Sequence, residues 1–187
     1  MYYVWFVIVA SMAKQERGEP KWPAMVKEYE GKNFTQDLAD YVITEDARKS
    51  ETASAFVKAN GRGCAKLASI LAQKGTGLMS EKAWTEMHAE PRKEYCGEMP
   101  SGIMRFNFTK GGVCEFVKFE DETKTDKMMY ENRYGYYGWF GYGGSVVQWH
   151  PELKIGFAFV PTYLNTTEMF NQRGAILQQL VVDCTKK

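Results

Sequence analysis

The spacing of apolar residues along the chain changes once, near its middle. In the first 90 residues the spacing is mostly helical, whereas from Ile103 to Pro161 apolar and polar residues mostly alternate as in strands. The clearest predicted helix covers about 63–73, where apolar side chains recur at i, i+3, i+4 and i+7 and Gly75 provides the C-cap. A further helix over 81–87 is predicted to follow Ser80 as its N-cap.

The alternating part predicts an antiparallel sheet that contains two hairpins. One turn holds Gly111 and Gly112, and the other holds His150-Pro151-Glu152, where proline suits the second position of a type I turn. Charged residues over 118–127 predict a solvated connection between the hairpins. The expected strand pairs are 103–108 with 113–119 and 146–149 with 155–160.

The chain ends with a predicted helix from Thr167, its expected N-cap, to Cys184. The apolar residues of this helix form one stripe, and we expect that stripe to lie on the sheet. The strand over 155–160 is apolar on both faces, so we also expect a cover on each side of it. The stripe consists of Met169, Arg173, Ile176, Leu177, Leu180, Val181 and Cys184.

The length of 187 residues suits one hydrophobic core and predicts a single α+β unit. The opening apolar run, 1–10, is interpreted as a buried helix whose last turns emerge into water. It is too short to span a bilayer, so no membrane span is expected, and it lacks the positive start of a signal peptide.

Charge and cysteine usage argue against several classes of protein. Twenty-four Lys and Arg residues stand against 23 Asp and Glu residues, a net charge of +1 without long runs of one sign, so no nucleic-acid partner is expected. Only two histidines are present, His88 and His150, and we place both on the surface. No metal or cofactor is expected, because the cysteines are widely spaced. Their pairing stays open for Cys64, Cys96, Cys114 and Cys184.

Three Asn-x-Ser/Thr sequons occur, at Asn33, Asn107 and Asn165. Used sequons would place the chain in the secretory pathway. Sequons that never meet a glycosyltransferase are an equal alternative, so the localisation stays open.

Three stretches, in this order, resemble the C-terminal half of serine β-lactamase-like domains. This family includes class C β-lactamases, penicillin-binding proteins and related esterases. The stretch 59–80 resembles its small-residue turn, helix and following Leu-x-Ser helix start; 138–151 resembles the strand of its third catalytic motif and the hairpin after it; 154–160 resembles the next strand. The resemblance implies one partial domain of this fold over 1–187, with a sheet, helices packed on it and a terminal helix. Residues 50–187 match well and the helical region 1–50 only loosely.

The resemblance also implies which residues would line a site. The third motif aligns with Trp139-Phe140-Gly141, so an indole stands where the family usually has Lys or His, as in some of its esterases. Gly141 would let a substrate carbonyl approach, and the backbone N–H of Tyr142 matches a donor to the oxyanion. The alternative is that this aromatic strand only packs against the core.

An acyl-transfer site also needs a nucleophile and a base. Ser11-Met12-Ala13-Lys14 has the family's Ser-x-x-Lys spacing, which puts both side chains on one side of a helix. We interpret it as a helix exit with an exposed Lys14, because the family's serine starts a buried helix. Tyr130-Glu131-Asn132 spells the family's Tyr-x-Asn, but it lies so near Trp139 that we treat it as coincidence.

Three functions fit these observations. We prefer an incomplete, catalytically inactive family member that leaves a sheet edge open for another protein chain to complete. The second is an active hydrolase of a small amide or ester, using Ser11 with Lys14 or a partner chain. The third is a noncatalytic binding protein, in which the tyrosine-rich run 130–142 contacts a sugar or peptide. Whether the chain is an enzyme therefore stays open.

Overall fold

The computed structural model describes residues 40, 43–49, 57–99, 102–141, 143–162 and 170–186. The chain forms two compact units, 1–58 and 59–187. In the first unit, helix α4 (Glu45–Lys49) begins after Thr44, whose hydroxyl oxygen accepts a hydrogen bond from the N–H of Ala47 at 3.2 Å. The second unit holds the sheet.

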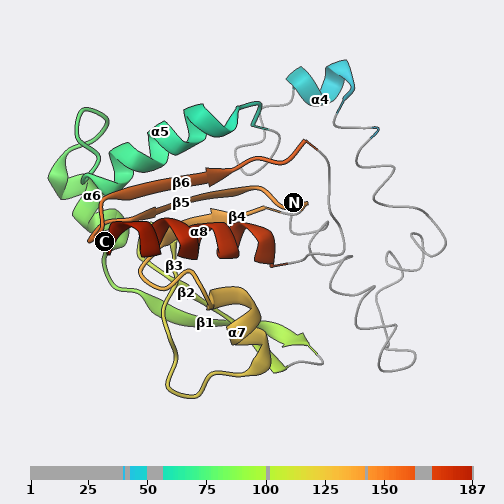
Figure 1. The fold of residues 1–187 in the computed structure, drawn as a ribbon, viewed down its shortest axis with the longest axis vertical. Coiled ribbons are helices and arrows are strands. Elements are labelled where there is room, and N and C mark those ends of the chain that lie inside the picture. The colour runs from blue at the N-terminus through green and yellow to red at the C-terminus, as the bar shows by residue number, and fades with distance from the viewer. Residues whose placement is uncertain are drawn as a thin grey trace. The chain divides into compact units, whose positions relative to one another are not determined.

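The sheet of the second unit is antiparallel, has six strands and follows the chain order from β1 to β6 (Figure 1). This confirms the predicted α+β class. Both predicted hairpins form, although the strand after the double-glycine turn is only two residues long. The strands are β1 (Arg92–Met99), β2 (Gly102–Phe108), β3 (Cys114–Glu115), β4 (Tyr137–Phe140), β5 (Val146–His150) and β6 (Ile155–Phe159).

Helix α5 (Gly61–Ala72) covers one face of the sheet and packs mainly on β6. Its residues Ala68, Leu71 and Ala72 form a core cluster with Trp149 of β5. The predicted helix is confirmed, but the predicted C-cap is wrong: Gln73 is the cap, and the chain reverses through Lys74, which has a φ of 60°. Helix α6 (Glu81–His88) follows and starts at Ser80, as expected.

The charged stretch 118–127 is not only a solvated connection, as was predicted, because helix α7 (Lys124–Tyr130) begins within it. Thr123 and Asp126 form a capping box, in which each side chain binds the backbone N–H of the other residue. Met129 and Tyr130 are buried at the end of α7. The prediction failed because the apolar residues that bury this helix are few and lie at its end.

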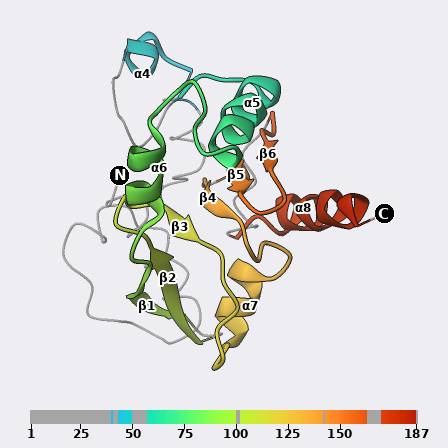
Figure 2. The same ribbon diagram turned by 90° about the vertical axis from the view of Figure 1, so that its left-hand side faces the viewer.

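Helix α8 (Gln172–Thr185) lies on the face opposite α5 (Figures 1 and 2), because its Gln178 contacts Gln148 whereas α5 contacts the next residue of β5, Trp149. Asn171 is its N-cap, so the helix starts later than predicted. The expected N-cap Thr167 and the first residue of the expected stripe, Met169, lie outside the described residues.

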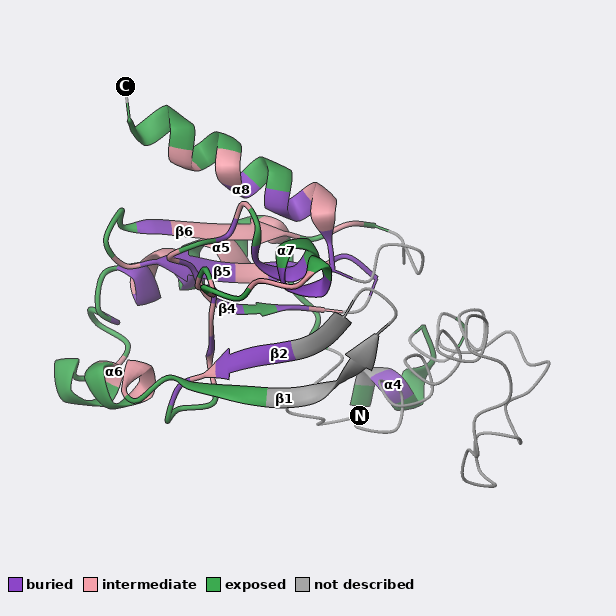
Figure 3. Ribbon diagram, turned by 90° about the horizontal axis from the view of Figure 1, so that it is seen from below, coloured by how far each residue is buried: buried purple, intermediate pink, exposed green. Residues whose placement is uncertain are grey.

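The orientation predicted for this helix is wrong. Gly174, Ala175 and Gln178 are buried, whereas most of the expected core stripe faces solvent, with Ile176 56% and Leu180 54% exposed (Figure 3). The small residues Gly174 and Ala175 let the helix approach β5 closely, and Gln178 donates a hydrogen bond to Gln148. Within the described residues, no helix has the length and apolar character to span a membrane.

Candidate functional site

Strand β4 places Trp139, the residue at the third-motif position, on an aromatic surface. Its indole stacks on Phe108 of β2 with the ring centroids 5.6 Å apart, and it lies at a tilt against Phe106 at 5.0 Å. Phe106 is buried, and Trp139 is 36% exposed. The indole thus forms the solvent-facing part of an apolar platform. Its N–H can only donate a hydrogen bond, so Trp139 cannot serve as a base.

The turn after β4 is closed by its own backbone hydrogen bonds. The N–H of Gly141 donates to the carbonyl of Ser145 at 2.7 Å, and the N–H of Gly144 donates to the carbonyl of Gly141 at 3.2 Å. A Cβ on Gly141 would touch only Ser145, at 3.7 Å, so the backbone is not crowded there. Tyr142, whose N–H was the expected oxyanion donor, lies outside the described residues.

The expected Ser-Lys pair, Ser11 and Lys14, also lies outside the described residues. Two of the described serines have structural contacts: Ser80 caps α6, and the hydroxyl of Ser69 accepts a hydrogen bond from the side chain of Gln73. Tyr130, the tyrosine of the Tyr-x-Asn sequence that was treated as coincidence, is fully buried. Its hydroxyl donates a hydrogen bond to the carbonyl of Arg105 at 2.9 Å. Burial raises the pKa of the Tyr130 phenol, which makes it a poor acid or base.

Neither histidine is the surface residue that was predicted. The indole N–H of Trp149 donates to Nε2 of His88 at 2.9 Å, so Nδ1 of His88 carries the proton and donates to the carbonyl of Trp84 at 2.7 Å. His150 is buried at 6% exposure, and its Nδ1 accepts the backbone N–H of Leu153 at 3.3 Å. Burial lowers the pKa of both rings, which favours their neutral forms.

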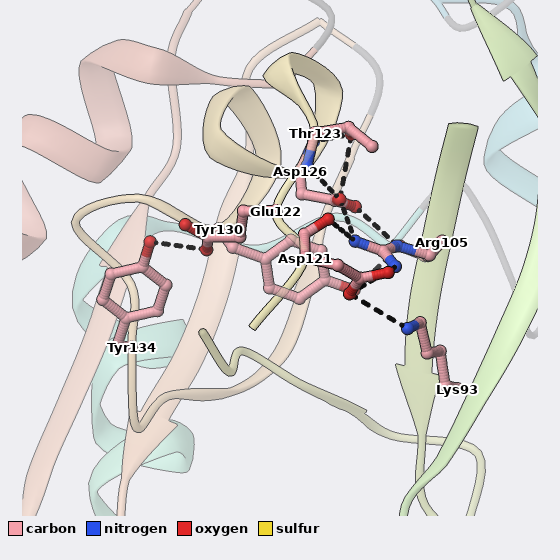
Figure 4. Close-up of polar contacts among 8 residues, drawn as sticks. All are labelled: Lys93, Arg105, Asp121, Glu122, Thr123, Asp126, Tyr130 and Tyr134. Atoms are coloured by element: carbon pink, nitrogen blue, oxygen red, sulfur yellow. Dashed lines mark hydrogen bonds and ion pairs between the residues drawn. The ribbon is translucent and has the colours of Figure 1, made fainter. Parts of the chain in front are cut away.

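A buried ion cluster that the sequence analysis missed joins β2 to α7 (Figure 4). The Arg105 guanidinium donates to both carboxylate oxygens of Asp126 and binds Asp121 at 2.9 Å. Asp126 is fully buried and also accepts the N–H of Thr123 at 2.8 Å. Although burial opposes it, the bonds from Arg105 and Thr123 hold the pKa of Asp126 below its usual value. The pair of Arg105 and Asp126 thus anchors the start of α7 to β2, whereas the Asp121 side chain is 71% exposed.

A second polar network lies between α7 and α8. Arg133 is fully buried and donates to the carbonyls of Met129 at 2.6 Å, Phe170 at 2.5 Å and Asn171 at 2.5 Å, and to the Gln178 side chain at 3.3 Å. Its guanidinium lies over an aromatic ring of β4, that of Phe140, at 5.0 Å from the centroid. These bonds hold the start of α8 against the end of α7.

The sequon at Asn107 is buried in the folded chain and inaccessible to a glycosyltransferase. The Asn107 side chain is 8% exposed, and its amide donates to Glu115 at 2.8 Å. The sequon's hydroxyl, on Thr109, is buried and donates to the carbonyl of Met87 at 2.7 Å. A glycosyltransferase could not reach this amide without unfolding β2. Asn33 and Asn165 lie outside the described residues.

The remaining candidate residues are metal ligands and the cysteines. Among the described residues, no three His, Cys, Asp or Glu side chains gather closely enough to hold a metal ion. Cys64 is half-buried and Cys184 is exposed, and both are free thiols, whereas Cys114 is buried with its sulfur 4.0 Å from the Tyr130 hydroxyl. The Cys96 side chain lies outside the described part.

Comparisons with models of protein families and with curated proteins find no match for this chain. The class that the structure defines is therefore the architectural one: an α+β unit with an antiparallel sheet and a helix on each face.

Proposed function

We propose that this chain is a β-lactamase-related domain portion that performs no acyl transfer of its own and uses the third-motif strand as part of its scaffold. The observation that carries the proposal is the position of Trp139. Its ring packs on Phe106 and Phe108, at the point where a hydrolase of this kind would hold a Lys or His beside the reacting group.

The order of elements supports the family part of the proposal. A glycine-containing strand, β4, is followed by the hairpin of β5 and β6 and then by helix α8 on the sheet. The resemblance of the sequence implied this order. The packing of α5 against β6, where Gly156 touches the backbone of Ser69, gives the helix after the small-residue turn a place on the opposite face.

The hydrogen bonding supports the noncatalytic part. The N–H of Gly141 donates to the carbonyl of Ser145, so the end of the third-motif strand is closed by a backbone hydrogen bond within its own turn. His88 and His150 each use a ring nitrogen as an acceptor for an internal donor. The hydroxyl oxygens of Ser69 and Ser80 likewise accept internal hydrogen bonds, from the side chain of Gln73 and from the N–H of Ala83.

A turnover assay with two substrate classes tests the proposal. The purified 187-residue chain is incubated with a chromogenic cephalosporin and with p-nitrophenyl esters of short acids, beside a Ser11→Ala variant and a heat-unfolded sample. We expect equal rates from the folded chain and both controls, because Trp139 provides neither nucleophile nor base. Hydrolysis by the folded chain that is lost in Ser11→Ala would make the chain an active serine hydrolase.

A further inference from the structure

Helix α6 (Glu81–His88) contains no fully buried residue. Its three half-buried side chains, Trp84, Met87 and His88, lie on one side of the helix. The indole N–H of Trp84 donates to the carbonyl of Leu71 in α5 at 2.8 Å. A helix of this length is marginal in water on its own, so α6 depends on its contacts with the rest of the fold.

His88, the last residue of α6, uses both of its ring nitrogens in hydrogen bonds. Nδ1 donates to the carbonyl of Trp84 at 2.7 Å, within the helix, and Nε2 accepts the indole N–H of Trp149 in β5 at 2.9 Å. An indole N–H can only donate, and a protonated imidazole carries a proton on each nitrogen. Protonation of His88 would place two donors against each other, so the bond to Trp149 requires the neutral ring.

Two titratable groups of the sheet lie near the His88 ring. The Glu115 carboxylate of β3 attracts a proton to the ring, but burial outweighs this attraction and lowers the pKa of His88. The Tyr137 ring of β4 meets the His88 ring edge-on, with the centroids 4.8 Å apart. Its hydroxyl donates to Glu115 at 2.5 Å, and burial raises the pKa of Tyr137, so this phenol stays neutral.

The ion pairs at the two ends of α6 keep their charges near neutral pH. Glu86 pairs with Lys110 of the β2–β3 turn at 2.9 Å, which lowers the pKa of Glu86 and raises that of Lys110. Glu81 pairs with Lys74 at 2.6 Å, which lowers the pKa of Glu81. His88 is therefore the group at the contact of α6 with β5 that changes its charge between pH 7 and 5.

We propose that His88 is a pH-sensitive latch, whose protonation breaks the hydrogen bond to Trp149 and releases α6 from the sheet while the sheet itself stays folded. The inference does not depend on the proposed function. The docked helix binds the neutral ring, so the released helix binds a proton more tightly. Docking is strongest above about pH 6.5, the ordinary pKa of histidine, and weakens below it by up to about tenfold in its equilibrium constant per pH unit.

Backbone hydrogen bonds hold the end of α6 in a way that does not depend on pH. The carbonyl of Met87 accepts hydrogen bonds from the N–H of Gly111 at 3.2 Å and from the hydroxyl of Thr109 at 2.7 Å. The carbonyl of Ala89 accepts the N–H of Lys110 at 2.7 Å. The released helix would thus stay attached at its C-terminal end, and its earlier turns would unwind.

Residue-resolved amide hydrogen exchange of the full 187-residue chain between pH 7 and 5 tests the latch. After correction for the intrinsic pH dependence of exchange, we expect the amides of Trp84 to Glu86 to lose protection several-fold, while the amides of β5 keep theirs. Over the same range, the NMR signal of the Trp149 indole N–H should shift with the midpoint of the His88 ring protons.

Two histidine variants form a matched pair for this experiment. In His88→Gln the side-chain oxygen can still accept the indole N–H of Trp149, but the side chain does not titrate, so we expect the pH response of α6 to disappear. His150 is the other buried histidine, and it lies on the opposite face of β5 from its neighbour Trp149. His150→Gln should leave the response of α6 within twofold of the wild type.

Three results would overturn the proposal: protection of α6 that is unchanged at pH 5, a response that persists in His88→Gln, or loss of protection in β5 together with α6. If His88→Gln does not fold, the wild type still decides. The α6 amides and the Trp149 indole must then follow the ring protons of His88, and a midpoint that matches His150 alone would contradict the latch.

Discussion

The two sides of the sheet are held by different kinds of contact. On the α5 side, small and apolar residues such as Ala68 and Leu71 pack around Trp149, and Gly156 brings β6 against the backbone of α5. On the α7–α8 side, the fully buried Arg133 and Gln178 connect the helices through hydrogen bonds. The apolar side therefore depends on shape, whereas the polar side depends on the hydrogen bonds that these buried side chains make.

This difference explains why the prediction that the apolar stripe of α8 faces the sheet is wrong. A helix normally buries its apolar side, but α8 buries Gly174, Ala175 and Gln178, because Gln178 completes the network of Arg133 and Gln148. The hydrogen bonds of Gln178 and the small size of Gly174 and Ala175 favour this orientation, in which Leu177 and Leu180 are exposed. The following variants test the contrast, from the largest expected effect to the smallest.

Arg133→Leu is expected to cost the most stability, about 4 kcal/mol in the free energy of unfolding. The substitution leaves the carbonyls of Met129, Phe170 and Asn171 buried without this donor. Urea unfolding of both proteins, followed by circular dichroism, measures the difference. Arg92→Leu is the control, since its side chain is 73% exposed and should matter little. A loss below about 1 kcal/mol for Arg133→Leu would contradict a polar side that depends on satisfied partners.

Asp126→Asn should cost about 3 kcal/mol, because it removes the buried charge partner of Arg105 and weakens the cap of α7 at Thr123. Asp121→Asn is the matched control: it binds the same guanidinium, but its side chain is 71% exposed, so we expect little change. The same urea unfolding measurement applies. If both variants lose equal stability, burial is not what makes the Arg105–Asp126 pair important.

Gly156→Ala tests the apolar side and should cost about 2 kcal/mol. A Cβ at this position would collide with the backbone of Ser69, which cannot rotate out of the way. Gly61→Ala, at the start of the same helix, meets no atom within 4 Å and should be neutral. Thermal unfolding compares the two. An unchanged midpoint in Gly156→Ala would show that α5 can shift on the sheet, and that close packing does not fix this side.

The free energy of unfolding should fall modestly as the pH is lowered. Burial lowers the pKa of His88 and of His150 in the folded state, so the unfolded chain binds protons first as the pH falls below about 6.5. Stability is then complete above this pH and falls below it, by at most about 1.4 kcal/mol per pH unit for each ring. Urea unfolding between pH 7 and 5 measures the slope, and His88→Phe should reduce it. A flat profile would contradict the neutral, buried rings.

The local features of this fold were predictable from the sequence, and the long-range ones were not. Local signals in the sequence predict both hairpins and also helices α5 and α6. These signals are glycines, a capping serine and regular apolar spacing within a few residues. β1 went unpredicted, since an outer strand rich in charge lacks the apolar alternation. At the candidate site, Trp139 was chosen by resemblance, but its contacts with Phe106 and Phe108 join strands distant in the sequence.

The polar networks show the same limit. Arg133 and Gln178 are residue types that usually lie on the surface, and no local pattern marks them as buried partners. Their burial follows from a contact between α7 and α8 that forms only in the folded chain. The capping box of Thr123 and Asp126 is a local signal, because the two residues are three positions apart. This spacing could have predicted the start of α7 from the sequence.

The most direct test of the central claim, that the third-motif strand serves as scaffold and not as part of an acyl-transfer site, is covalent labelling measured by intact mass. The folded chain is treated with a fluorophosphonate and, separately, with a fluorescent penicillin. We predict no mass increase with either reagent, because Trp139 packs on Phe106 and Phe108 and offers no base. Stoichiometric addition of one label that is lost in Ser11→Ala would contradict this account.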